Sequence, residues 1–109
     1  MPLYSQSKHK TNLSTPFTSL EVLSKALIRR DSILVSNIVT DEGYNNILNQ
    51  NLFMFGEKWL GMIRKKRVTV FHDSKKLQIL KIDQEDYLLN FILDDTTHQW
   101  KFTAFITKP

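Results

Sequence analysis

The second half of the chain, from Arg67 to Pro109, alternates between short apolar runs and tight polar segments. The runs read RVTVF, KLQILKI, YLLNFIL and WKFTAFIT, and polar residues that favour turns separate them. Short runs rich in β-branched and aromatic residues are typical of strands. Because the connections are too short for parallel crossovers, this pattern predicts a four-stranded antiparallel meander.

The alternation within these runs predicts a sheet whose two faces differ. On the third strand, the residues expected to share one face are Tyr87, Leu89, Phe91 and Leu93. On the last strand, the expected faces are Trp100, Phe102, Ala104 and Ile106 against Lys101, Thr103, Phe105 and Thr107. This pattern is typical of a sheet with helices on one face and water on the other. Because Leu88, Ile92 and Phe105 add apolar residues to the second face, we expect that face to close over a pocket or to meet another subunit.

The first half of the chain predicts helices with recognisable beginnings. Thr18 and Glu21 have the spacing of a capping box, and apolar residues follow at helical intervals. Asp31 or Ser32 can cap a second, shorter helix. Thr40 precedes two carboxylates that suit the first turn of a third helix. We therefore expect three helices before the strands.

Residues 52–66 do not favour a single structure. The segment LFMFGEKWLGMIRKK is too densely apolar for a clean period, and Gly56 and Gly61 each weaken a helix by about 1 kcal/mol relative to alanine. A loop, a helical turn and an early strand all remain open here. The length of the chain suits one domain. We expect residues 1–15 to form a disordered lead-in or linker and residues 16–109 to form a single α+β domain.

The predicted order of elements, over residues 16–109, resembles the NTF2-like (cystatin-like) α+β fold. The stretch TSLEVLSKALIRRDSILVSNIVTDEGYNNIL resembles the opening of small bacterial NTF2-like domains, and HQWKFTAFITKP resembles their last strand. This resemblance implies N-terminal helices packed on a curved sheet around a cone-shaped pocket, and frequent dimerisation. Members range from enzymes to pure binding modules. A chain of this kind that has lost a signal or membrane anchor would belong to a bacterial envelope or conjugation-type assembly.

Aromatic residues around the ambiguous segment are the first candidate site. Aromatic residues and methionine are enriched at the cores of protein interfaces. The predicted partner-binding residues are Phe53, Phe55, Trp59 and Phe105. They suit a non-enzymatic interaction module that binds a protein partner, or a second copy of itself, through the sheet. The competing interpretation is that these side chains plug the open end of the sheet.

A basic band is the second candidate site. The net charge is +4, but between residues 58 and 81 eight basic residues face a single acid, Asp73. The predicted anion-binding residues are Lys58, Arg64, Lys65, Lys66, Arg67, Lys75 and Lys76, with Lys81 at the end of the band. Such a band attracts nucleic acid or another anionic surface, and Trp59 or Phe71 can stack on bases. Lysines that guard an exposed strand edge would look the same.

Candidates for chemistry are few. His72, His98 and Asp94 fall at predicted turns, where they are expected to cap their own backbone. There is no cysteine and no recognised metal, nucleotide or nucleophile motif, so we expect no enzyme activity, no metal and no cofactor. A small-molecule or enzymatic cone pocket remains the third alternative. No apolar run is long enough for a membrane span. The compartment stays open: cytoplasmic for a complete chain, extracytoplasmic if a signal or anchor was removed.

Overall fold

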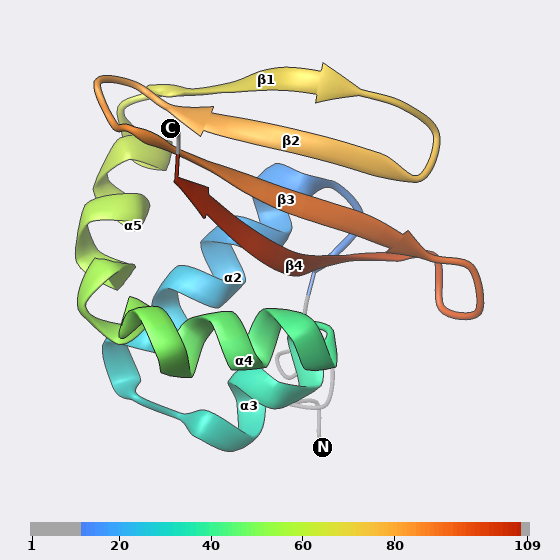
Figure 1. Ribbon diagram of the computed structural model, residues 1–109, viewed down its shortest axis with the longest axis horizontal. Helices are drawn as coiled ribbons and strands as arrows, with labels where there is room; N and C mark the ends of the chain where they lie inside the picture. The colour runs from blue at the N-terminus through green and yellow to red at the C-terminus, as the bar shows by residue number, and fades with distance from the viewer. Residues whose placement is uncertain (1–11, 108–109) are drawn as a thin grey trace, which may run out of the picture.

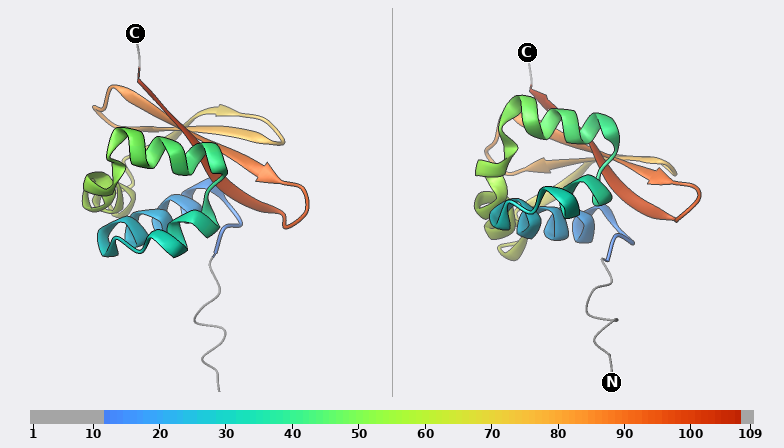
Figure 2. Two further views of the ribbon diagram at one scale, coloured as in Figure 1. Left: turned by 60° about the horizontal axis from the view of Figure 1, so that its bottom comes forward. Right: turned by 90° about the horizontal axis from the view of Figure 1, so that it is seen from below.

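The computed structural model describes residues 12–107 and has the α+β architecture that the pattern predicts. The helical half contains α2 (Pro16–Arg29), α3 (Ser32–Ile38), α4 (Asp41–Gln50), the short 3-10 helix η1 (Leu52–Phe55) and α5 (Gly56–Arg64). The strands are β1 (Val68–Asp73), β2 (Leu77–Ile82), β3 (Tyr87–Asp94) and β4 (Gln99–Thr107). They form one antiparallel sheet in the order β1-β2-β3-β4, which confirms the meander. The helices gather on one side of this sheet (Figures 1 and 2).

The first helix begins three residues earlier than the predicted capping box at Thr18 and Glu21. Thr15 caps α2: its Oγ1 accepts a hydrogen bond from the Thr18 amide, and the Thr15 amide donates to Thr18 Oγ1. Pro16 then occupies the first helical position, where its missing N–H removes no helical hydrogen bond. The prediction was wrong because two capping pairs compete in this sequence, and only the earlier one has proline next to it.

The packed part of the chain also begins before residue 16. Leu13 is buried, and its carbonyl oxygen accepts a hydrogen bond from the Trp100 amide at 2.8 Å. The end of the predicted lead-in is therefore fixed against β4. Residues 1–11 of that segment lie outside the described residues.

The predicted caps of the next two helices are confirmed. Asp31 accepts a hydrogen bond from the Leu34 amide at the start of α3, and Thr40 accepts one from the Gly43 amide at the start of α4. The Thr40 amide also donates to the Phe102 carbonyl at 3.0 Å. Thr40 thus ends the loop between α3 and α4, caps α4 and links the start of that helix to β4.

The ambiguous segment 52–66 is helical. It contains η1 and α5, and Gly56 permits the turn between them to press against α2. A Cβ at Gly56 would lie 2.8 Å from the Ser24 carbonyl oxygen. Close packing therefore explains a glycine that weakens the helical pattern. Among residues 12–107, no helix is both long and apolar enough to cross a membrane.

The core lies between the helices and the inner face of the sheet. Its fully buried side chains include Leu20, Leu23, Leu27, Val35, Ile47, Leu52, Trp59, Leu80, Ile82, Leu89, Phe91 and Phe102. The third strand follows its predicted alternation: Tyr87, Leu89 and Phe91 are buried, whereas Leu88, Asn90 and Ile92 are only partly buried. One layer of helices thus covers one face of the sheet, and the other face is left without helices.

A β-bulge corrects the predicted faces of the last strand. Asn90 pairs with Ala104 but Phe91 pairs with Phe102, so Thr103 is an extra residue in β4. The inserted residue shifts the alternation, and Phe105 joins Phe102 on the inner face, where its ring stacks on Tyr87. Ala104 and Ile106 consequently lie on the opposite face, which the helices leave uncovered. The prediction that Phe105 belongs to the second face was wrong for this reason.

Candidate protein-interaction surface

The face of the sheet that the helices leave uncovered carries a continuous aliphatic surface. Its members come from three neighbouring strands, and they are Leu77, Ile79, Leu88, Ile92, Ala104 and Ile106. We call these six residues, with Asn90 among them, the outer face. The pairing register places them side by side: Leu77 lies opposite Ile92, and Leu88 lies between Lys81 and Ile106.

The outer face is not part of the core. The buried core and the partly buried apolar side chains that pack on it include Phe105 but none of the six aliphatic residues. Five of the six are partly buried by their neighbours in the sheet, and Ile106 is 44% exposed. Neighbouring aliphatic side chains without a covering layer are typical of surfaces that bind another protein.

Asn90 occupies the middle of the outer face. It pairs with Ile79 on one side and with Ala104 on the other. Its Oδ1 atom is buried, yet it accepts no hydrogen bond from any described residue. A buried acceptor without a donor costs about 1–3 kcal/mol. The described residues therefore give this acceptor no donor, and a partner on the outer face could supply one if the Asn90 amide turned outward.

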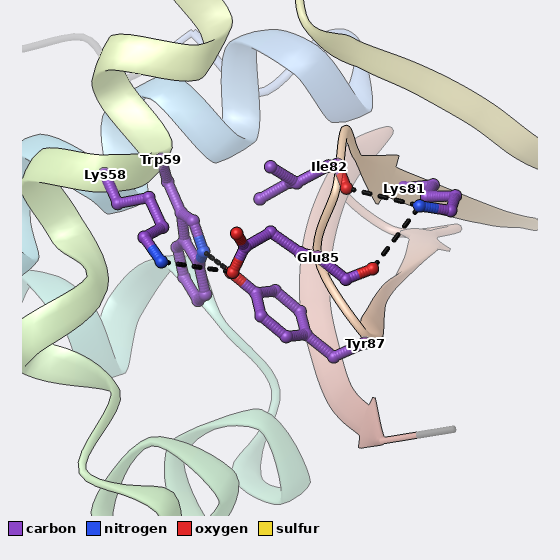
Figure 3. Close-up of polar contacts among 6 residues, drawn as sticks. All are labelled: Lys58, Trp59, Lys81, Ile82, Glu85 and Tyr87. Carbon is purple, nitrogen blue, oxygen red and sulfur yellow. Dashed lines mark hydrogen bonds and ion pairs between the residues drawn. The ribbon is translucent and has the colours of Figure 1, made fainter. Parts of the chain in front are cut away.

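The predicted aromatic site forms the end of the core instead of an open surface. Trp59 is fully buried, and its Nε1 donates a hydrogen bond to Tyr87 Oη at 2.9 Å (Figure 3). Phe55 lies with its ring centroid 5.8 Å from that of Phe105, and Phe105 stacks on Tyr87 at 4.5 Å. Phe53 is partly buried beneath the guanidinium of Arg30. The structure thus brings three of the four predicted residues, Phe55, Trp59 and Phe105, together around Tyr87, with Trp59 out of reach of a partner, whereas Phe53 lies against Arg30.

An ion pair closes this aromatic cluster at the surface. Lys58 Nζ lies 3.1 Å from Glu85 Oε1, next to the Trp59–Tyr87 hydrogen bond (Figure 3). Burial raises the pKa of the Tyr87 phenol well above its ordinary value, against the opposing hydrogen bond from Trp59. The phenol therefore stays protonated well above physiological pH. Its oxygen accepts the hydrogen bond from the Trp59 indole.

The predicted basic band is divided in the structure. Arg64, Lys65, Lys66 and Arg67 lie at the end of α5 and before β1, whereas Lys75 and Lys76 lie in the turn after it. The six residues of β1 separate the two groups by about 20 Å. Three of the cations are also paired with carboxylates: Lys58 with Glu85, Arg67 with Asp83 and Lys76 with Asp95. Only part of the band is therefore available to a polyanion.

The candidates for chemistry do not converge. His72 lies on the exposed strand β1, and His98 lies in the turn before β4 with a left-handed φ of 55°. Asp94 pairs with Lys101 at 3.5 Å, and the backbone N–H of Thr96 lowers the pKa of its carboxyl group. Among residues 12–107, no three histidine, aspartate or glutamate side chains are grouped to hold a metal ion. A cleft of about 520 Å³ beside β4 has mixed walls, with Val39 and Ile92 beside polar residues such as Thr40 and Lys101.

Alternation along the third strand places Leu88, Asn90 and Ile92 on the outer face, but sequence reasoning missed Ile79, Ala104 and Ile106. Ile79 alternates with Leu80 in the run KLQILKI, so its place was readable from periodicity. Ala104 and Ile106 were hidden by the bulge at Thr103. The orphaned amide of Asn90 has no signal in a single sequence.

Comparison with known proteins adds no assignment. No protein-family model, no curated protein and no solved structure matches this chain. The resemblance to NTF2-like domains therefore stays a prediction.

Proposed function

We propose that this chain is a non-enzymatic interaction module whose outer face binds a protein partner or a second copy of itself. The observation that carries the proposal is the aliphatic outer face with the buried, unsatisfied Oδ1 of Asn90 at its centre. Apolar contact would supply most of the affinity, and a donor to Asn90 would fix the register of the partner. The resemblance to NTF2-like domains favours a bacterial envelope or conjugation-type assembly as the setting.

The composition of the outer face favours protein over nucleic acid. Its six apolar residues are all aliphatic, whereas proteins that bind single strands present aromatic side chains on which bases stack. Of the two aromatic residues expected to stack, Trp59 is fully buried and Phe71 is 58% exposed on β1. The division of the basic band also argues against a continuous path for a phosphate backbone.

The interior favours binding over catalysis. The polar side chains that reach into the core are already engaged: Trp59 with Tyr87, Ser19 with the Trp100 carbonyl, and Ser24 with the Leu20 carbonyl. General acid–base chemistry needs a titratable group that a substrate can approach. The core supports a rigid scaffold for the outer face instead.

Site-specific photo-crosslinking tests the proposal even while the identity of the partner is unknown. A photoreactive phenylalanine analogue replaces Leu88 on the outer face in one variant and Ile33 in another. Ile33 is the matched control, because it is 75% exposed on α3, and α3 belongs to the helical layer on the side of the sheet opposite the outer face (Figure 1). Both variants are irradiated in the cells that produce the protein, and the adducts are resolved by mass.

We expect a discrete adduct from position 88 and none of that mass from position 33. An adduct of twice the mass of the chain identifies a second copy, and any other single mass identifies a different protein. A second variant, Ile79→Asp, combined with the probe at position 88, should remove the adduct, because it places a charge in the apolar contact. Equal adducts from both positions, or none from position 88, would overturn the proposal.

A further inference from the structure

A shallow basic pocket lies on the outer side of the sheet, where β1 begins and β2 ends. It has a volume of about 330 Å³ and is lined by Lys66, Arg67, Thr69, Lys81 and Asp83. Thr69 lies opposite Lys81 in the β1–β2 pairing, and the Asp83 amide donates to the Arg67 carbonyl one step further along. Two paired positions of one hairpin therefore supply four of the five lining residues.

The end of α5 delivers the fifth residue, Lys66. The Arg67 amide donates to the Met62 carbonyl and the Lys66 amide to the Ile63 carbonyl, with Lys66 at a left-handed φ of 58°. These two hydrogen bonds define a Schellman motif, which ends the helix and reverses the chain. The motif fixes the backbone of Lys66 and Arg67 at the rim of the pocket.

The pocket holds an excess of two positive charges. Arg67 Nη1 contacts Asp83 Oδ2 at 2.6 Å, so this pair is neutral as a whole, and the remaining guanidinium N–H groups stay available. Lys81 Nζ donates to the carbonyl oxygens of Ile82 and Glu85 at 3.4 and 3.3 Å, which leaves its charge uncompensated (Figure 3). The ammonium group of Lys66 has no ion-pair partner among residues 12–107.

The outer face begins directly beside the pocket. Leu88 lies opposite Lys81 on the neighbouring strand, and Ile106 lies opposite Leu88 on the next. A ligand with its anionic group between Lys66 and Lys81 would therefore extend over aliphatic side chains. In the row Lys81, Leu88 and Ile106, the lysine would bind the charged group of such a ligand, and the two aliphatic side chains would contact its apolar part.

We propose that this pocket binds the terminal phosphate of a phosphate monoester whose organic part is aliphatic. Two uncompensated cations, an arginine held by a carboxylate and the Thr69 hydroxyl match a dianion with several acceptor oxygens. A nucleic-acid backbone fits less well, because each of its phosphates carries one charge and because β1 separates the pocket from Lys75 and Lys76 by about 20 Å. The aliphatic part would cover Leu88 and Ile106, which also belong to the outer face, but the two proposals are tested separately, because the titration uses the isolated chain and the crosslinking uses cells.

The test is a nuclear magnetic resonance titration of the whole chain with two ligands that share one tail. Hexyl phosphate is largely a dianion at pH 7.5, whereas hexyl sulfate carries a single negative charge at every pH used. We expect hexyl phosphate to bind about tenfold more tightly at pH 7.5 and to shift the amide signals of residues 66–69 and 81–83. The preference should vanish at pH 5, because the second pKa of a phosphate monoester is about 6.

Variants separate the two parts of the site. Lys81→Gln should weaken hexyl phosphate about tenfold, because it removes one of the two uncompensated charges. The matched control is Lys25→Gln on α2, an exposed lysine paired with Glu21 away from the pocket, which should leave binding unchanged. Asp83→Asn should strengthen binding, since it removes the one carboxylate that lines the pocket. Leu88→Ala should weaken hexyl phosphate about fivefold but leave inorganic phosphate unchanged.

The proposal that this pocket binds a phosphate dianion would be overturned by either of two results. One is equal binding of hexyl phosphate and hexyl sulfate at pH 7.5, and the other is equal effects of Lys81→Gln and Lys25→Gln. Inorganic phosphate that binds as tightly as hexyl phosphate would overturn the aliphatic part of the proposal and indicate a free phosphate as the ligand.

Discussion

The indole Nε1 of Trp59 donates a hydrogen bond to the phenol oxygen of Tyr87 at 2.9 Å, and both side chains are buried. The bond joins α5 to β3, two elements that share no hydrogen bond in the backbone ladder. It also satisfies the indole N–H, the only polar atom of Trp59's side chain. The aromatic residues around it, Phe55 and Phe105, complete the end of the core. The cluster that was expected to meet a partner therefore stabilises the fold.

The Tyr87→Phe variant should lose about 1–3 kcal/mol of unfolding free energy. The substitution keeps the ring but leaves the Trp59 N–H buried without an acceptor. Urea denaturation followed by tryptophan fluorescence measures the loss. Tyr44→Phe is the control, because Tyr44 is a partly buried tyrosine of α4 and should lose little. Equal losses in the two variants would contradict the assigned role of the Trp59–Tyr87 hydrogen bond.

The same phenol should make the protein sensitive to alkali. Burial raises the pKa of Tyr87 above the value of 10.0 that holds in the unfolded chain, so the folded state keeps the proton that the unfolded state releases. This contribution to stability is complete below pH 10 and is lost as the pH rises toward the folded-state pKa. Unfolding free energies measured between pH 8 and pH 11 should fall more steeply for the natural chain than for Tyr87→Phe. Parallel curves would show that Tyr87 ionisation does not contribute.

Two glycines of α5 should respond in opposite ways to alanine. A Cβ at Gly56 meets the Ser24 carbonyl oxygen at 2.8 Å, so Gly56→Ala must push α5 away from α2 and should cost about 1–3 kcal/mol. A Cβ at Gly61 meets nothing within 4 Å, so Gly61→Ala should stabilise the protein by about 0.5–1 kcal/mol through helix propensity. Thermal unfolding of the two variants gives the comparison. Destabilisation by both would mean that Gly61 is also packed.

Local patterns predicted the parts of the fold in which one signal acts alone. The meander follows from the short connections, Thr40 is the cap predicted for α4, and Asp31, one of two adjacent candidates, caps α3. The cap of α2 was misplaced because Thr15 and Thr18 both suit the role, and the sequence cue that favours Thr15 is Pro16 at the first helical position. Propensity identifies the region of a helix start better than its first residue.

The outer face was harder to predict because it depends on register. Alternation assigns a side chain to a face only while the pairing stays in step, and one extra residue at Thr103 exchanges the faces of everything after it. Phe105 therefore moved to the core, and Ile106 moved to the surface. The burial of Trp59 depends on its contact with Tyr87, which lies 28 residues away in the sequence. No local pattern could therefore distinguish an interface residue from a core residue at this position.

Asn90→Val should stabilise the isolated chain by about 1 kcal/mol. The change removes a buried acceptor without a donor and places a β-branched residue in a central strand. Asn46→Ala is the opposite case, because Asn46 Oδ1 accepts a hydrogen bond from the Phe105 amide at 3.1 Å, and it should cost about 1 kcal/mol. Urea denaturation of both variants measures the difference in sign. A destabilised Asn90→Val would mean that the amide is already satisfied in the isolated chain and would remove the main support for a donor from a partner.

Lys66→Gly should raise stability while it weakens anion binding. Lys66 ends α5 with a φ of 58°, a conformation that costs a residue with a side chain about 1 kcal/mol and glycine almost nothing. Asn51→Gly is the matched control, since Asn51 ends α4 at a similar φ of 53° but asparagine tolerates this region, so its gain should be smaller. Thermal unfolding ranks the two gains, and the hexyl phosphate titration should weaken for Lys66→Gly only. These two results together would explain why lysine stands at a position where glycine is more stable: its charge binds the anion. Unchanged binding in Lys66→Gly would instead leave the strained lysine without a role in the pocket.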